Sequence, residues 1–283
     1  MMHKLKRKLV LFAVLPALWA QASSVETIRI YSGSMEKHIP ATLILPDAYK
    51  DTARRFPVVY LLHGAGDSHS KWNETTDVSK LSDTYNIIFV CPDADKTSWY
   101  FDSPINPQSQ YETFIAKECV EYIDKNYRTK SHRTYRALCG NSMGGHGSMF
   151  LAIRHPDVFS IAVPLSGGVD IRPYPDKWGI KDRIGSSSKV WDEYTVIELT
   201  KSLRDGELAI SIDCGDQDFF LSMNRALHAQ LTEAGITHEY VEKTGGHTWA
   251  YWDEAIKRQM PFIVRNFQRT TIAAPNKEMQ ASN

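Results

Sequence analysis

The sequence predicts one doubly wound α/β domain, with a mostly parallel sheet and helices on both faces. Two observations lead to this prediction. Short, uninterrupted apolar runs recur along the chain, as is typical of strands that are covered on both faces. Stretches with helical periodicity separate them, and this alternation predicts parallel strands joined by helices. The length of 283 residues is compatible with one large domain.

The expected strands differ in pattern. Residues 26–31 and 39–45 alternate apolar and polar side chains like half-exposed strands, with a turn at Gly33 and Ser34 between them. The later strands are continuous apolar runs, which indicates cover on both faces. These runs are residues 57–62, 87–91, 135–139, 161–165, 208–214 and a short one at 238–241.

Four helical stretches are expected between or after these runs. They are residues 113–127, 144–154, 219–234 and 252–267. In the first, Phe114, Val120 and Ile123 keep one face apolar.

Two connections, residues 94–111 and 167–202, are unusually long for a compact domain. Both leave the carboxyl ends of strands, where open α/β sheets bind ligands. Their aromatic side chains either pack a cap onto the core or line a substrate pocket, and the sequence leaves both interpretations open. The pocket candidates are Trp99, Tyr100 and Asp102.

The first 22 residues form a separate segment. Four basic residues at positions 4–8 precede an apolar stretch at 9–20, and Ala20-Gln21-Ala22 supplies a small–x–small cleavage pattern. A membrane anchor is the alternative, but twelve helical residues reach only about 18 Å, against a hydrocarbon core of roughly 30 Å. We therefore expect a signal peptide cleaved after Ala22 and a secreted or periplasmic protein without a membrane anchor. Residues 23–269 would form the domain, and 270–283 a flexible tail.

Composition argues against several functional classes. Thirty-three basic residues balance thirty-three acidic ones without a basic stripe, so nucleic acid is not an expected partner. There is no C-x-x-C or H-E-x-x-H motif, so neither a metal nor another cofactor is expected. The four cysteines lie in apolar or helical stretches and are expected to be small buried residues.

A nucleophile elbow is expected at Gly140-Asn141-Ser142-Met143-Gly144. This G-x-S-x-G motif follows an apolar run and opens a helical stretch, which is the context that an exposed nucleophilic serine requires. The segment His63-Gly64-Ala65-Gly66 ends an earlier strand. The backbone N–H groups of Ala65 and Met143 would then stabilise an oxyanion. A dinucleotide-binding loop is the rival interpretation, and it fails because His69 stands where a third glycine is needed.

A base and an acid follow the serine in chain order. His247 stands late in the chain in a Gly-Gly-His segment, and it could accept and return the Ser142 proton. Three carboxylates, those of Asp213, Asp216 and Asp218, lie at a strand end, and one of them should orient the imidazole. The order Ser–Asp–His is that of the α/β hydrolases.

Together these segments resemble the esterase D-like branch of the α/β hydrolases. The branch includes S-formylglutathione hydrolases, tributyrin esterases, feruloyl and acetyl-xylan esterases, and mycolyltransferases. The matching stretches are residues 58–66, 99–104, 111–129, 140–166, 215–221 and 245–252. The resemblance implies an α/β-hydrolase fold, an ester or thioester substrate and no metal. It also implies that Asp218 is the acid, with Asp216 as second choice, because Gly215, Phe220 and Leu221 surround Asp218 in the family's spacing. Asn141 departs from the pattern, where an apolar residue is frequent.

The export signal weighs against a cytosolic thioesterase, and the oxyanion segment lacks the cysteine typical of those enzymes. We therefore expect a secreted serine carboxylesterase that acts through Ser142, His247 and Asp218. The expected substrate is a small-molecule or polysaccharide-linked ester, foremost feruloyl or acetyl groups on plant polysaccharides. A short-chain tributyrin-type esterase and a mycolyl-type acyltransferase are the alternatives. A non-catalytic binding protein on a hydrolase scaffold is the remote one.

Overall fold

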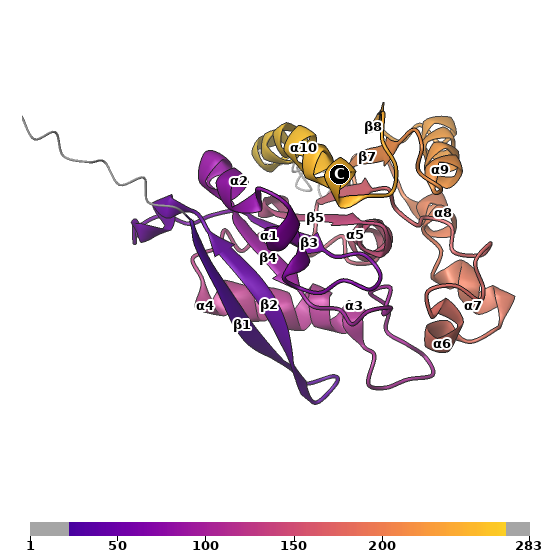
Figure 1. The fold of residues 1–283 in the computed structure, drawn as a ribbon, viewed down its shortest axis with the longest axis horizontal. Helices are drawn as coiled ribbons and strands as arrows, with labels where there is room; N and C mark the ends of the chain where they lie inside the picture. Colours follow the sequence, from indigo (N-terminus) through magenta and orange to yellow (C-terminus); the bar gives the residue numbers. More distant parts are fainter. Residues whose placement is uncertain (1–22, 270–283) are drawn as a thin grey trace, which may run out of the picture.

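Eight strands form a single sheet in the computed structural model, which describes residues 23–269 (Figure 1). The strands are β1 (Ser24–Ser32), β2 (Lys37–Leu45), β3 (Val58–Leu62), β4 (Ile88–Pro92), β5 (Arg136–Asn141), β6 (Ile161–Leu165), β7 (Ala209–Gly215) and β8 (His238–Lys243). Their order across the sheet is β1-β2-β4-β3-β5-β6-β7-β8. The first two pairings are antiparallel and all the others are parallel. The predicted fold class is confirmed. The expected signal peptide and tail lie outside the described residues.

Helices cover both faces of the sheet, which explains the uninterrupted apolar runs. All side chains of β3, β4, β5 and β6 are buried. On one face pack α5, η2 with α4, and α9, and on the other α2 and α10. Figure 1 shows α2 and α10 on one side of the sheet and α4 on the opposite side. The helices in these two layers are α1 (Lys71–Thr75), α2 (Val78–Tyr85), α3 (Tyr111–Thr113), the π-helical η2 (Phe114–Cys119), α4 (Val120–Asn126), α5 (Met143–Arg154), α9 (Leu221–Glu233) and α10 (Trp249–Arg269).

The parallel strands bring four short segments to one edge of the sheet. The loops after β3, β5, β7 and β8 leave at the carboxyl ends of these strands. Because the strands are neighbours and point the same way, these loops meet above the sheet. This edge is where the candidate site is built.

The remaining structure differs from the sequence-based expectation in two places. Two helices before β4, α1 and α2, were not predicted, because they are short and their apolar positions are few. The long connection after β6 contains α6 (Ile180–Ile184), α7 (Ser188–Glu193) and α8 (Val196–Leu199). The 3₁₀ turns are η1 (Asp47–Lys50), η3 (Arg133–Tyr135) and η4 (Thr200–Ser202). No helix in the described part of the chain is both long enough and apolar enough to cross a membrane.

Candidate active site

Ser142 occupies a sharp turn between β5 and α5. Its backbone has φ 55° and ψ −115°, a conformation that non-glycine residues rarely adopt. The turn needs glycine nearby, because a Cβ on Gly144 would collide with the Leu62 carbonyl oxygen of β3. The strain holds Ser142 at the end of the strand, where its hydroxyl projects away from the sheet.

An imidazole and a carboxylate extend from this serine in one hydrogen-bonded row. His247 Nε2 lies 2.8 Å from Ser142 Oγ, and His247 Nδ1 lies 2.9 Å from Asp218 Oδ2. The Asp218 side chain is fully buried and also accepts a bond from the Phe220 N–H. A buried carboxylate beside Nδ1 keeps the proton on that nitrogen, which leaves Nε2 free to accept the serine proton.

The loops that carry the acid and the imidazole touch through their main chains. A Cβ on Gly215, at the end of β7, would collide with the Gly245 carbonyl oxygen. The same carbonyl accepts a hydrogen bond from the Gln217 N–H at 2.9 Å. The separation of Asp218 and His247 is therefore set by a backbone contact between their loops.

The three carboxylates around β7 have three different positions. Asp216 accepts a bond from the Gly245 N–H at 3.1 Å and one from the Thr244 hydroxyl, so it braces the loop that carries His247. Asp213 is buried and faces α10, where Tyr251 and Gln259 bond to it. Of the three, only Asp218 reaches the imidazole. The sequence alone had left this choice open.

The loop after β3 closes over the serine. A Cβ on Gly64 would lie 3.4 Å from the Ser142 Cβ, which places the next residue, Ala65, close to Ser142. Among the described residues the Ala65 N–H donates no hydrogen bond, and Met143, as the first residue of α5, has no intrahelical partner for its N–H. Two unpaired donors therefore stand next to Ser142.

His63 braces this loop, a role that sequence analysis did not assign. Its Nε2 accepts a bond from the Ala94 N–H at 3.0 Å, so its Nδ1 carries the proton and donates to the Gly64 carbonyl at 2.9 Å. Burial lowers the pKa of His63, which keeps the ring neutral and this bond pattern intact.

The structure does not support the pocket role expected for Trp99 and Tyr100, while that of Asp102 stays a prediction. Trp99 and Tyr100 are 1% and 0% exposed, so neither can line an open pocket. Tyr100 donates its hydroxyl to the His63 carbonyl, and Asp102 accepts a bond from the Thr113 N–H at 2.9 Å. These residues fasten the long 94–111 connection to the core, which was the other interpretation.

Two further side chains border the site without having been predicted there. Phe219, directly after the acid, is 53% exposed, and its ring centroid lies 4.2 Å from that of His247. Asp67, in the loop over the nucleophile, has a pKa raised by partial burial, and its Oδ2 would lie 3.4 Å from a Cβ on Gly64. Phe219 follows Asp218 and Asp67 follows Gly66 in the sequence, but adjacency to a motif residue does not show whether a side chain faces the site.

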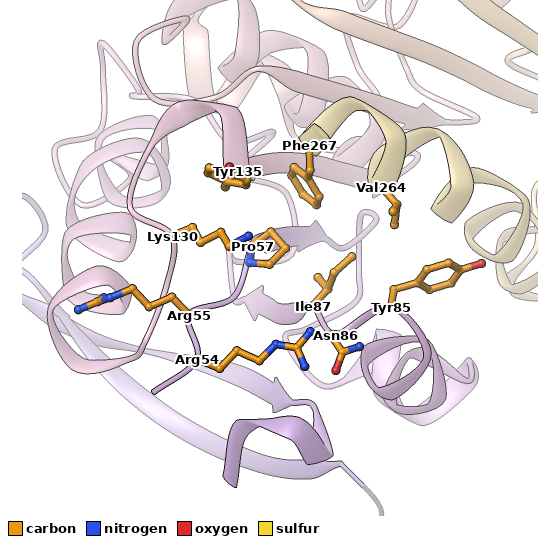
Figure 2. Close-up of a pocket in the computed structure, with 10 residues that line it drawn as sticks. All are labelled: Arg54, Arg55, Pro57, Tyr85, Asn86, Ile87, Lys130, Tyr135, Val264 and Phe267. Carbon is orange, nitrogen blue, oxygen red and sulfur yellow. The ribbon is translucent and has the colours of Figure 1, made fainter. Parts of the chain in front are cut away.

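The described residues contain no cluster of three or more histidine, cysteine or acidic side chains that could hold a metal ion. Their four cysteines are buried, as expected, and none of these four is in a disulfide. Two hollows lined by described residues, of about 390 and 440 Å³, lie at the amino ends of the strands, and the first is shown in Figure 2.

Comparison with known proteins gives consistent matches. The model of the family described as putative esterase matches residues 32–263. An esterase from Mycobacterium tuberculosis is 28% identical over 73% of this chain, which spans about half (52%) of that protein. An acetyl esterase from Caldicellulosiruptor saccharolyticus is 24% identical over 82% of this chain and 95% of its own. The structure of a ferulic acid esterase superposes with a TM-score of 0.76 and 28% identity, covering 87% of this chain and 99% of its own.

Proposed function

The chain belongs to the putative esterase family, and from that premise we propose that it is a serine carboxylesterase acting through Ser142, His247 and Asp218. One observation carries the proposal. The imidazole of His247 bonds Ser142 Oγ on one side and Asp218 on the other, at 2.8 and 2.9 Å. A serine hydroxyl needs such a base to become a nucleophile.

The proposed reaction has two halves. Ser142 Oγ attacks the ester carbonyl carbon while His247 Nε2 takes its proton, and the N–H groups of Ala65 and Met143 bind the resulting oxyanion. The intermediate collapses by breaking the bond to the alcohol oxygen, which receives the proton from His247. Water then attacks the acyl-enzyme with His247 again as base, releasing the carboxylic acid and restoring Ser142.

The proposed substrate carries a feruloyl or acetyl group on a plant polysaccharide. Two of the similar proteins, the ferulic acid esterase and the acetyl esterase, support this choice. The expected signal peptide at residues 1–22 supports export, which would bring the enzyme to a polymer outside the cell.

A fluorophosphonate probe tests the chemistry, because only an activated serine reacts with it. We expect one covalent adduct, located at Ser142 by peptide mass spectrometry and absent after Ser142→Ala. Ser202→Ala, at an exposed 3₁₀ turn, is the matched control and should label normally. An unlabelled wild-type protein would support the non-catalytic alternative.

A hydrolysis panel tests the substrate. It contains methyl ferulate, acetylated xylan, short and long p-nitrophenyl esters and a glutathione thioester. The proposal expects turnover of the first two, with no activation by added metal. Turnover of the thioester or of long-chain esters alone would overturn the proposed substrate while leaving the triad in place.

A further inference from the structure

Phe219 is an exposed aromatic side chain beside the proposed base. Four large apolar side chains in the described part of the chain are exposed, and they are those of Val25, Tyr31, Ile105 and Phe219. The ring of Phe219 lies against His247, which is itself bonded to Ser142. An apolar surface left open to water next to a nucleophile is a place where part of a substrate can be buried.

The ring of Phe219 packs against other aromatic side chains that hold it in place. It lies nearly parallel to Trp178, with an interplanar angle of 14° and centroids 6.2 Å apart, and it meets Phe220 edge-on at 4.5 Å. Trp178 is held by a hydrogen bond from the buried Trp99 indole to its carbonyl. The side chain of Phe219 is therefore supported by two segments, the loop after β7 and the connection after β6.

This support favours a flat, rigid ligand group over a flexible chain. Aromatic rings pair in offset-stacked or edge-to-face geometry, and a preordered ring loses little conformational entropy when a second ring covers it. An acetyl group has no ring to cover the exposed surface, whereas a hydroxycinnamoyl group carries one a few bonds from its carbonyl.

We propose that Phe219 is a specificity-determining residue, whose ring, backed by Trp178, binds the aromatic ring of the acyl group during acylation and deacylation. The inference rests on the proposed carboxylesterase function and selects the aromatic acyl class within it. The ring must belong to the acyl half, because the alcohol half of the proposed substrate is a carbohydrate and has no aromatic ring.

The experiment measures kcat/KM for methyl ferulate and for p-nitrophenyl acetate in the wild type, Phe219→Ala and Phe219→Trp. We expect Phe219→Ala to lose at least about tenfold on the ferulate, equivalent to about 1.4 kcal/mol, and less than about threefold on the acetate. Phe219→Trp should retain most of the activity on ferulate, because it keeps an aromatic face. Tyr31→Ala removes an equally exposed ring (55%) on β1 and serves as the matched control.

Each outcome separates this inference from the function on which it rests. Equal losses on both esters would show that Phe219 only positions His247, and would overturn the specificity role. A loss on p-nitrophenyl acetate but not on methyl ferulate would place the ring site on the alcohol side, which also overturns it. An inactive wild type would overturn the proposed function itself. In that case equilibrium binding of free ferulate to wild type and Phe219→Ala still tests the ring site, and equal affinities would overturn it.

Discussion

The two ends of the central strands differ in what they offer a ligand. At the carboxyl ends the side chains of His247 and Asp218 form a hydrogen-bonded row with Ser142, and the unpaired N–H groups of Ala65 and Met143 lie beside it. At the amino ends lie the hollows of about 390 and 440 Å³. Figure 2 shows one of them, with Tyr135, Val264 and Phe267 along one rim and Arg54 and Asn86 along the other. These hollows therefore lie apart from the converging polar groups, and those groups identify the candidate site.

The charges of the two ends differ as well. The hollow of Figure 2 is lined by Arg54, Arg55 and Lys130 and by no carboxylate. The Lys130 ammonium lies 4.6 Å above the Tyr135 ring, so an aromatic face takes the place of a counter-ion. The residues that line this hollow include no serine, cysteine or histidine. If the two ends of the strands differ in this way, substitutions at the carboxyl ends should change the rate of ester hydrolysis, and substitutions at the amino ends should not.

The largest effect is expected at the nucleophile. Ser142→Ala removes the atom that forms the acyl-enzyme, so kcat/KM should fall by at least about 10⁴-fold. The midpoint of urea unfolding should not decrease, because alanine fills the same space. Near-normal turnover by a correctly folded variant would show that Ser142 is not the nucleophile.

The second largest effect is expected at Asp218, the proposed acid, and the nearby Asp216 supplies the control. Asp218→Asn should lower kcat by roughly 10²–10⁴-fold, because the amide no longer holds the imidazole in the productive tautomer. Asp216→Asn should cost less than about tenfold, because Asp216 bonds the Gly245 N–H of the loop and not the ring. Both variants are assayed together above about pH 7.5. If Asp216→Asn proved the more damaging change, Asp216 would be the acid.

The loss of stability at low pH should also arise from residues near the carboxyl ends of the strands. His146, on α5, is fully buried, and this burial lowers its pKa to about 4. In the unfolded chain a histidine has a pKa of about 6.5, so between these values only the unfolded chain binds the proton. The free energy of unfolding should therefore fall as pH drops from 6.5 to 4, by about 1.4 kcal/mol per pH unit from this residue. The lowered pKa of His63 acts in the same direction.

Urea unfolding at pH 7.5, 6 and 5 measures this dependence. His146→Gln should have a smaller pH slope than the wild type, whatever its stability at pH 7.5, because the variant has no imidazole at that position to protonate. Identical slopes for the two proteins would contradict the assignment of the pH dependence to His146.

The smallest effect is expected at the amino end. Arg54→Gln combined with Lys130→Gln removes two of the three cations of the hollow in Figure 2. Because the hollow lies at the far end of the strands from Ser142, kcat/KM on small esters should change less than about twofold. A tenfold change would show that the two ends are coupled and that the contrast drawn between them is wrong.

Most of the fold could be predicted because strands buried on both faces have a direct sequence signal. The runs at β3, β4 and β6 contain no charged residue and those at β5 and β7 are apolar over most of their length, and this continuity located them all. The short helices α6, α7 and α8 lack such a signal, since four to six residues show no periodicity. The family resemblance is confirmed by the esterase match over residues 32–263.

The site was predictable only in part. Ser142 could be located from local sequence, because a strained elbow needs a particular local pattern. The aromatic residues of the connections could not be assigned in the same way. Composition does not distinguish a buried ring such as Trp99 from an exposed one such as Phe219, because tertiary packing decides which of them meets water. The choice between Asp216 and Asp218 likewise depends on which way a loop turns, and it came from resemblance.

The contact between the Gly215 and Gly245 loops has a consequence for how this enzyme can acquire new substrates. The main chain sets the distance between Asp218 and His247. The position of the imidazole ring therefore does not depend on which side chains border the ring. Phe219 can then vary while the hydrogen-bonded row of Ser142, His247 and Asp218 stays in place. We expect a library randomised at Phe219 and Trp178 to contain many active members with altered acyl preference, whereas one randomised at Gly215 and Gly245 should contain almost none.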